Sequence, residues 1–368
     1  MKKILYITTL SRTINAFLVP HIEKLIKEGN IVDCACSEDV IVDKNLTDKG
    51  VKIFDIPFTR NPLHPINIKA FKELLRIQAE NNYDIVHVHT PIASLYGRLL
   101  KVKFPKLKTI YTVHGFHFYK GAPIVNWGIY YPIEKIMANL TDTMITMNSE
   151  DYERARKFKV KNTQKINGVG VDLKTYNLEL FDKNEARKKL NLAKDDFVIL
   201  MIAELNQNKN HKQMVNALDI LKKRGINVKV ICAGDGPLME DLNKDITNRK
   251  LNENIRFLGN RRDINELIIA CDIGILTSFR EGLPRNIMEL MACEKPVIGT
   301  NIRGIRDLIN DSFNGYLVNV NDSTETAKKI EVLFKNRELL ESMGSNAYKF
   351  IKDYDVDNVI ESLVEVYV

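Results

Sequence analysis

Groups that could do chemistry are concentrated between residues 277 and 296, in the stretch TSFREGLPRNIMELMACEKP. Two carboxylates, Glu281 and Glu289, flank the start of an expected helix, whose first turn can accommodate Pro284. Free backbone N–H groups at such a helix start bind phosphate readily, and carboxylates beside an anion site suit sugar hydroxyls. The alternative interpretation is structural: helix starts favour acidic residues, so Glu281 would be a capping charge and Glu289 a solvated side chain.

Two series of alternating apolar and amphipathic segments must position these groups. Strands are expected at residues 4–8, 31–36, 51–56, 85–89, 109–114 and 143–147, then at 197–203, 228–233, 255–258, 273–277 and 297–299. Helices are expected at 14–27, 66–80, 92–102 and 127–140, then at 212–224, 239–250, 264–270, 284–293, 324–334 and 338–353. This alternation is typical of α/β architecture with parallel sheets.

The two series imply two domains. A glycine-containing break at residues 165–172, KINGVGVD, ends the first series, and a linker leads to about residue 182. We therefore expect two doubly wound, Rossmann-like domains facing a central cleft, residues 1–180 and 181–352, and a C-terminal helix within 353–368 that packs back on the first. In open α/β sheets, ligands lie outside the carboxyl ends of the strands, so residues that follow strands are the site candidates.

The composition excludes several classes of protein. With 45% hydrophobic and 27% charged residues among 368, the chain is not disordered, collagen-like or a disulfide scaffold. The five cysteines form no CxxC pair, so the sequence indicates buried, reduced thiols and neither a zinc site nor a redox motif. Neither a membrane-spanning stretch nor a signal peptide is recognisable, which favours the cytoplasm.

The stretch around Glu281 and Glu289 resembles the signature of family 4 of the retaining nucleotide-sugar glycosyltransferases, which have the GT-B fold. Further segments match this family in its order: DIVHVHTP at 84–91, TVHG at 112–115, GVGVD at 168–172, GDGP at 234–237 and FLG at 257–259. The resemblance covers nearly the whole chain. Two segments look most like the EpsD-like branch, which builds exopolysaccharide and capsule repeat units: YTVHGFHFYKGAP at 111–123 and YYPIE at 130–134.

The resemblance implies a role for each residue of a donor site. Glu289 would bind the donor ribose, Glu281 would lie near the donor sugar and take part in catalysis, and Lys209 would neutralise the leaving phosphate. A preorganised cation stabilises the charge that develops on a departing diphosphate. The rest of the implied donor-binding set is Gly282, Leu283, Pro284, Arg285, Asn286, Gly234, Gly259 and Arg261. Neither a metal nor another cofactor is expected, and the repeated Asp-x-Asp at 353–357 is interpreted as helix capping.

Two segments depart from the family pattern. Glu204 stands where the family usually has an arginine, and we expect Arg280 to supply the missing positive charge and to pair with Glu204. The loop after the first strand lacks the family's Gly-Gly and reads TTLSRTIN at residues 8–15. Its candidate contacts to an acceptor or a phosphate are Ser11, Arg12, Thr13 and Asn15.

Histidines mark the ends of two neighbouring strands in the first series. His114 matches the family's histidine near the hydroxymethyl group of the donor sugar, which implies a catalytic role; the alternative is a packed structural histidine. His117 lies in an aromatic loop and is expected to shape an acceptor pocket. His87 and His89 share one face of a strand, but a metal site there would need further ligands.

The reaction that the resemblance implies is transfer of a hexose or N-acetylhexosamine from a UDP-sugar to a lipid-linked saccharide, with retention at the anomeric carbon. The main alternative is a UDP-GlcNAc 2-epimerase-like enzyme of the same fold, which needs no acceptor. A dinucleotide-dependent dehydrogenase would need GxGxxG after the first strand, of which GDGP at 234–237 is a fragment. A sugar-binding protein without enzymatic activity would normally be exported.

The basic excess is confined to the first half of the chain. Residues 1–180 contain 26 Lys and Arg against 18 Asp and Glu, whereas residues 181–368 contain 28 against 29. Each basic residue near an anionic leaflet is worth about 1 kcal/mol. We therefore expect peripheral attachment to the inner face of the cell membrane through the first domain, and no nucleic-acid partner. The candidate patches are Lys101, Lys103, Lys106 and Lys108, and Lys120 with Trp127, Tyr130 and Tyr131.

Overall fold

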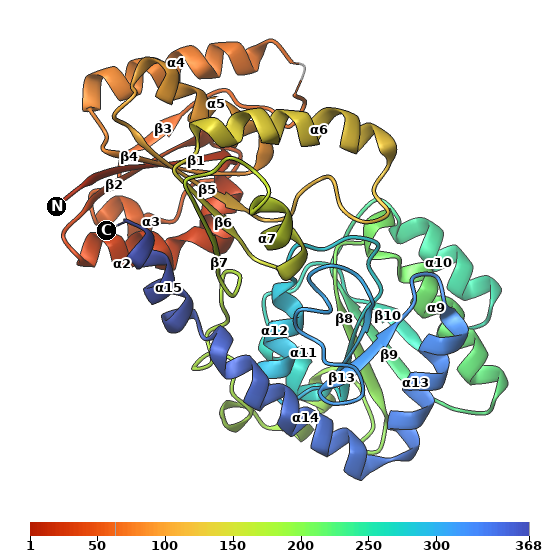
Figure 1. Ribbon diagram of the computed structural model, residues 1–368. Helices are drawn as coiled ribbons and strands as arrows, with labels where there is room; N and C mark the ends of the chain where they lie inside the picture. The colour runs from red at the N-terminus through yellow and green to blue at the C-terminus, as the bar shows by residue number, and fades with distance from the viewer. Residues whose placement is uncertain (63, 368) are drawn as a thin grey trace. The chain divides into compact units, whose positions relative to one another are not determined.

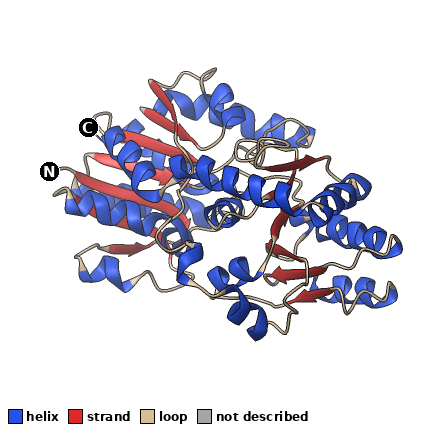
Figure 2. Ribbon diagram, turned by 90° about the horizontal axis from the view of Figure 1, so that it is seen from below, coloured by secondary structure: helices blue, strands red, loops and turns tan. Residues whose placement is uncertain are grey.

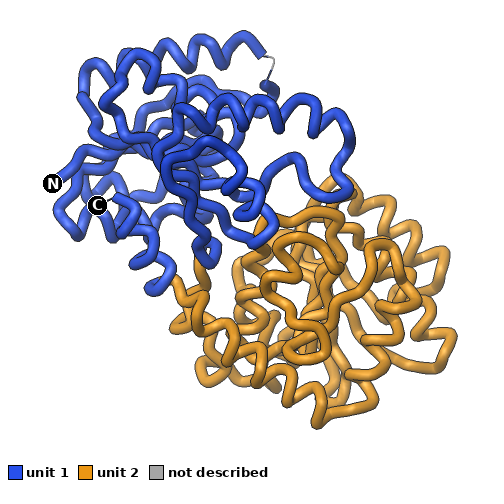
Figure 3. Tube along the Cα trace, viewed as in Figure 1, with its two compact units in different colours: residues 1–169, 357–368 blue, residues 170–356 orange. Residues whose placement is uncertain are grey.

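The computed structural model describes residues 1–62 and 64–367, which form two compact units (Figure 3). Unit 1 contains residues 1–169 and 357–368, and unit 2 contains residues 170–356. These bounds differ from the expected 180 and 353, because Val171 and Tyr176 pack into the core of unit 2. The N–H of Val171 also donates to the carbonyl of Tyr354 at 2.9 Å, which holds both crossing segments on unit 2.

Unit 1 is built on a seven-stranded parallel sheet in the order β3-β2-β1-β4-β5-β6-β7 (Figure 1). Its strands are β1 (Lys3–Leu10), β2 (Ile31–Ser37), β3 (Ile53–Asp55), β4 (Ile85–His89), β5 (Lys108–Val113), β6 (Thr143–Thr146) and β7 (Asn162–Lys165). Helices cover both faces of the sheet (Figure 2), which explains the continuous apolar runs in its central strands. The strand order reverses between β1 and β4, so their carboxyl ends form the position where ligands of such sheets bind.

The helices of unit 1 follow most of the predicted ranges. They are α1 (Ser11–Thr13), the π-helical turn η1 (Ile14–Leu18), α2 (Val19–Lys27), α3 (Lys44–Asp48), α4 (Ile66–Asn81), α5 (Pro91–Lys103), α6 (Ile124–Met137), the 3₁₀ turn η2 (Ala138–Leu140), α7 (Ser149–Ala155), α15 (Val356–Val364) and the 3₁₀ turn η6 (Glu365–Tyr367). The helix expected at 14–27 instead contains a π-helical turn before Pro20, which has no N–H to continue the α-helical pattern.

Unit 2 repeats the plan with six parallel strands in the order β10-β9-β8-β11-β12-β13. These are β8 (Val198–Ile202), β9 (Lys229–Ala233), β10 (Ile255–Phe257), β11 (Ile273–Leu276), β12 (Val297–Thr300) and β13 (Gly315–Val318). The helices are α8 (Lys183–Lys189), α9 (His211–Lys223), α10 (Met239–Asn248), α11 (Ile264–Ala270), α12 (Arg285–Ala292), α13 (Ser323–Lys335) and α14 (Arg337–Ile351), with 3₁₀ turns η3 (Leu178–Leu180), η4 (Gln207–Lys209) and η5 (Lys352–Tyr354). The order reverses between β8 and β11, which makes the loops after these strands the second candidate position.

The end of the chain returns to unit 1, as expected, and brings α15 beside the first strands (Figure 1). Val359, Leu363 and Val366 are buried in the same apolar cluster as residues of β1 and β2. The hydroxyl of Tyr367 is buried and hydrogen-bonds to the hydroxyl of Tyr6 and to Nδ1 of His87. The last residues are therefore an integral part of the core of unit 1.

Three histidines of unit 1 are buried and a fourth, His114, is half-buried, and we predict that these four make the unit labile to acid. Burial lowers the pKa of His21 and of His114 from 6.5 to about 4, and lowers the pKa of His87 and of His89 well below 6.5. Below pH 6.5 these histidines bind protons in the unfolded chain but stay neutral in the folded unit. Their contribution to the free energy of unfolding is therefore complete above pH 6.5 and is lost as the pH falls. Each histidine then costs up to about 1.4 kcal/mol per pH unit.

Hydrogen exchange followed by mass spectrometry between pH 7 and 5, corrected for the intrinsic exchange rate, tests this prediction. We expect the protection of β4 and β5 in unit 1 to fall more steeply than that of β8 and β11 in unit 2. Unit 2 is the internal control, because its one histidine is His211, whose pKa burial lowers to about 4. An equal decline in the two units would contradict the prediction.

Candidate functional site

The loops after β8 and β11 are joined to each other at the switch point of unit 2. The N–H of Phe279 donates to the carbonyl of Asn208 at 2.8 Å, and Nδ2 of Asn208 donates to the carbonyl of Arg280 at 3.0 Å. The hydroxyl of Thr277 donates to the carbonyl of Asn210 at 2.9 Å. These bonds fix the β11 loop against the turn that carries Lys209.

Lys209 and Glu281, both predicted to be catalytic, form an ion pair in this frame. Nζ of Lys209 lies 2.7 Å from Oε1 of Glu281, and the two side chains are 22% and 12% exposed. Nε of Arg303 donates to the backbone carbonyl of Glu281 at 3.1 Å. Helix α12 is capped by Pro284 without a side-chain hydrogen bond, so Glu281 is not a helix cap. A lysine and a carboxylate are thus preorganised and remain reachable from solvent.

Glu289 lies on the inner side of α12 and is not the solvated residue of the structural alternative. Its side chain is buried. Oε1 of Glu289 lies 3.0 Å from Nε of Arg285, and the carboxylate also hydrogen-bonds to Tyr176. Burial raises the pKa of Glu289, although Arg285 and Tyr176 oppose the shift. Asn286 anchors the same helix to β8, because its Nδ2 donates to the carbonyl of Ile202 at 2.6 Å.

Glycines allow the backbones of this site to approach closely. Gly234 has φ +146°, and a Cβ there would lie 2.1 Å from the carbonyl oxygen of Ala203. Gly304 has φ +79°, and its Cβ would lie 2.0 Å from the carbonyl oxygen of Gly282. Gly259 has φ +65° but no atom within 4 Å of a Cβ, so only its backbone conformation favours glycine. The N–H of Gly234 donates to its carbonyl at 2.8 Å.

Other residues of the predicted donor site contact the protein itself. In the described part of the chain, no ion pair joins Arg280 to Glu204, so the expected pairing is wrong: Arg280 is exposed, and its carbonyl is what binds Asn208. Arg261 pairs with Asp263 through Nε and Oδ1 at 2.8 Å. Leu283 is partly buried against the core and helps to seat the loop.

Three side chains in the first loop of unit 1, which were expected to contact a ligand, bind the segment after β2 instead. The hydroxyl of Ser11 donates to the carbonyl of Val40 at 2.6 Å, and Arg12 pairs with Asp39. Nδ2 of Asn15 donates to the carbonyl of Ile41 at 2.9 Å. These three side chains hold the segment after β2 in place, so they act as loop anchors in this structure rather than as free ligand contacts.

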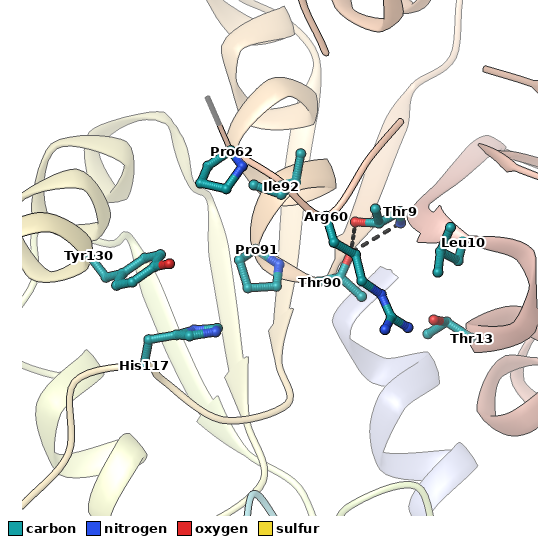
Figure 4. A pocket seen from close by; sticks show the side chains of 10 residues that line it. All are labelled: Thr9, Leu10, Thr13, Arg60, Pro62, Thr90, Pro91, Ile92, His117 and Tyr130. Atoms are coloured by element: carbon teal, nitrogen blue, oxygen red, sulfur yellow. Dashed lines mark hydrogen bonds between the residues drawn. The ribbon is translucent and has the colours of Figure 1, made fainter. Parts of the chain in front are cut away.

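Thr13 and His117 instead line a pocket of about 230 Å³ at the switch point of unit 1 (Figure 4). The ring of His117 stacks on that of Tyr130 with centroids 4.6 Å apart, and the guanidinium of Arg60 lies across the pocket from this pair. Thr90 has φ +63°, which is rare for a β-branched residue, and its hydroxyl accepts the N–H of Thr9 at 3.1 Å. The lining residues are Thr9, Leu10, Thr13, Arg60, Pro62, Thr90, Pro91, Ile92, His117 and Tyr130.

His114 follows β5 and is half-buried beside the histidines of β4. Its Nε2 lies 3.1 Å from Nδ1 of His89. His87 uses both ring nitrogens, one for Tyr367 and the other for the hydroxyl of Thr112 at 2.7 Å. Within residues 1–62 and 64–367, no cluster of histidine, cysteine, aspartate or glutamate has the arrangement of a metal site.

Two family models cover most of the chain. Residues 3–149 match the model "Glycosyl transferase 4-like", and residues 182–350 match "Glycosyl transferases group 1". The putative glycosyltransferase EpsD of Bacillus subtilis is 34% identical over 100% of this chain and 96% of its own length. The chain belongs to the group 1 glycosyltransferases. The predicted family and its EpsD-like branch are thereby confirmed.

Other relatives of this glycosyltransferase bear more specific names. A UDP-Gal:alpha-D-GlcNAc-diphosphoundecaprenol alpha-1,3-galactosyltransferase of Escherichia coli is 27% identical over 94% of this chain and 91% of its own. The crystal structure of HepE of Anabaena with UDP and glucose has a TM-score of 0.82 and 22% identity, covering 100% of this chain and 99% of HepE. This likeness confirms the predicted GT-B fold.

Several residues of the candidate sites in this glycosyltransferase have no clear sequence signal. Gly304 and Arg303 come from the loop after β12, which contacts the β11 loop only in the folded chain. The feature of the sequence that could have indicated them is their position directly after an expected strand. Arg60 and Thr90 also lie in loops, and only the folded chain brings them to the pocket of unit 1. The positive φ of Thr90 cannot be recognised from the sequence.

Proposed function

We propose that this glycosyltransferase moves a hexose or N-acetylhexosamine from a UDP-sugar to a lipid-linked saccharide, with retention at the anomeric carbon, in exopolysaccharide or capsule synthesis. The observation that carries the proposal is the Lys209–Glu281 pair just before α12, with Glu289 buried in the second turn of that helix. The names of EpsD and of the diphosphoundecaprenol galactosyltransferase support the acceptor class, and the UDP complexes of HepE support the nucleotide.

The chemistry of the donor side follows from these charges. Cleaving the bond between the anomeric carbon and the phosphate oxygen leaves negative charge on UDP, which Lys209 and the N–H groups at the start of α12 stabilise. The acceptor oxygen bonds to the anomeric carbon, and its proton passes to the departing phosphate oxygen on the same face. Glu289 accepts hydrogen bonds from the ribose hydroxyls. Arg280, exposed and beside Glu281, adds positive charge, so we propose no metal requirement.

The acceptor would occupy the pocket of unit 1. Its stacked pair of His117 and Tyr130 offers an apolar face to a sugar ring, and the hydroxyls of Thr9 and Thr13 can bind sugar hydroxyls. The guanidinium of Arg60 suits a phosphate oxygen of a lipid diphosphate. This pocket gives the transferase proposal an advantage over the epimerase, which uses no acceptor.

Calorimetric titration with UDP, GDP and ADP tests the proposed donor class. We expect UDP to bind most tightly and to lose affinity in Glu289→Ala, with Glu294→Ala as control; Glu294 is an exposed carboxylate just beyond the same helix. Preference for GDP or ADP would contradict the UDP assignment. Release of a sugar epimer from UDP-GlcNAc without any acceptor would favour the epimerase.

We also propose that unit 1 attaches to the inner leaflet mainly through α6, since only Lys103 and Lys106 of the four predicted lysines are exposed. Lys101 pairs with Asp142, and Nζ of Lys108 donates to the carbonyl of Val366 at 2.9 Å, so both have structural roles. Helix α6 instead exposes one apolar stripe. The stripe consists of Val125, Ile129, Ile133 and Ile136, which are 59%, 51%, 37% and 66% exposed.

The charges of α6 favour an anionic lipid surface. Its one acidic residue, Glu134, is buried in an ion pair with Arg98 at 2.8 Å, whereas Lys135 is exposed. In the described chain, no helix is long and apolar enough to cross a membrane. An apolar stripe with exposed positive charge is typical of a helix that lies in the interface of a bilayer.

Replacing Ile129 and Ile136 by aspartate should therefore weaken binding to vesicles of phosphatidylglycerol and phosphatidylcholine by about tenfold or more, since each buried side chain is worth about 1.5–3 kcal/mol. Flotation of the vesicles measures the bound fraction. Ile68→Asp is the matched control, because Ile68 is 56% exposed on α4. An equal loss in the control, or no loss in the double variant, would contradict attachment through α6.

A further inference from the structure

The hydrogen bond between His89 and His114 determines which nitrogen of His114 is left for a ligand. It joins Nδ1 of His89 to Nε2 of His114 at 3.1 Å. His114 is half-buried, and within the described chain its only hydrogen bond is this one. Its Nδ1 is therefore the atom that a ligand can reach, and the chemistry of that atom depends on where the ring carries its proton.

Both rings are neutral at physiological pH. Burial lowers the pKa of His114 to about 4, and burial also lowers the pKa of His89 well below 6.5. Each neutral imidazole has one N–H and one lone pair, so one ring must donate to the other. Two arrangements are possible, with the shared proton on Nδ1 of His89 or on Nε2 of His114.

The surroundings of His89 decide between these two arrangements. Its Nε2 is buried and has no hydrogen-bond partner. If His114 were the donor, the single proton of His89 would lie on this nitrogen as a buried N–H without an acceptor, which folded proteins rarely tolerate. If His89 is the donor, its Nε2 carries only a lone pair and no N–H is stranded.

The ring of His89 is also held in place by its neighbours. It is 1% exposed, with its centroid 4.3 Å from that of His87 and 5.5 Å from that of Tyr6 at an interplanar angle of 16°. His87 is itself fixed by Thr112 and by Tyr367. His89 therefore cannot turn to offer its other nitrogen without disturbing this packed stack.

We infer that His89 is a positioning residue: it donates from Nδ1–H to His114 Nε2 and thereby fixes His114 as an Nδ1–H donor toward an oxygen of the bound ligand. That this oxygen is a hydroxyl of the donor sugar rests on the proposed function. The tautomer itself does not, because it follows from the hydrogen bond and from the buried nitrogen of His89.

Long-range ¹H–¹⁵N correlation spectra of the full-length protein labelled with ¹⁵N-histidine at pH 7.5 test the inference, with His114→Gln identifying the signals. We expect His114 to be protonated at Nδ1. Protonation at Nε2 would overturn the inference. This readout needs neither donor nor acceptor, so a failure of the proposed function would leave it unaffected.

Two variants then test the role of His89. His89→Phe keeps an aromatic ring but has no donor, so we expect His114 to lose its fixed tautomer and kcat for sugar transfer to fall by roughly 10- to 100-fold, the range for loss of an orienting partner. His89→Gln, whose amide can donate, should restore the Nδ1-protonated signal and part of kcat. An unchanged His114 tautomer in folded His89→Phe would contradict the assignment.

Discussion

Replacement of Lys209 by alanine should reduce kcat for sugar transfer by about 10²- to 10³-fold, the range for removal of one preorganised group that stabilises developing charge. In the structure, Nζ of Lys209 is already placed 2.7 Å from Glu281. The variant removes the cation and leaves the carboxylate without its partner beside a departing diphosphate. Both changes raise the barrier, and steady-state release of UDP in the presence of acceptor measures the loss.

Lys212→Ala is the matched control for this prediction. Lys212 is exposed in the first turn of α9, three positions further along the chain, and has no hydrogen bond or ion pair among the described residues. We expect this variant to retain full activity. A Lys209→Ala enzyme within threefold of the wild type in kcat, with about equal folding stability, would remove Lys209 from the reaction.

The second large effect is expected for Gly304→Ala, which should lower the free energy of unfolding of unit 2 by about 2–5 kcal/mol. Gly304 has a left-handed backbone, and its Cβ would lie 2.0 Å from the carbonyl oxygen of Gly282. Since that carbonyl is backbone, either the β12 loop or the β11 loop must move. A shift of the β11 loop would move the start of α12, where the proposed diphosphate contacts lie, so we also expect UDP affinity to fall about tenfold or more.

Gly259→Ala separates the close contact from the backbone strain. Gly259 has a similar φ of +65°, but a Cβ there meets nothing within 4 Å. We expect it to cost only about 1 kcal/mol. Urea denaturation of both variants, followed through exchange-protected amides of β8 and β11, gives the comparison. Equal losses in the two variants would show that the contact with Gly282 contributes nothing.

Much of the fold could be predicted because buried parallel strands produce continuous apolar runs. β4 at Ile85–His89 and α11 at Ile264–Ala270 have the expected bounds. β7, with the sequence NTQK, was missed, since an edge strand with an exposed face needs no apolar run. The boundary between the units was misplaced for a related reason: Val171 belongs to unit 2 through a contact with Tyr354, far along the chain.

The proximity of candidate site residues was predictable where one strand, loop and helix hold them together. Glu281 and Glu289 are of this kind, and the structure removes the solvated alternative for Glu289. Ser11 and Asn15 were assigned to ligand contacts, yet they anchor a loop more than twenty residues away. Local spacing cannot reveal such partners. Local spacing also could not show that Lys108 donates a hydrogen bond to the carbonyl of Val366.

Mass spectrometry of a lipid-diphosphate-linked saccharide incubated with the enzyme and a UDP-hexose or UDP-N-acetylhexosamine tests the proposed transfer most directly. We expect the acceptor to gain the mass of one sugar residue and UDP to appear in equal amount. Neither should occur without acceptor, and Lys209→Ala should suppress both. UDP or free sugar formed at the same rate with no acceptor, and an acceptor of unchanged mass, would contradict the assignment of this chain as a transferase to lipid-linked saccharides.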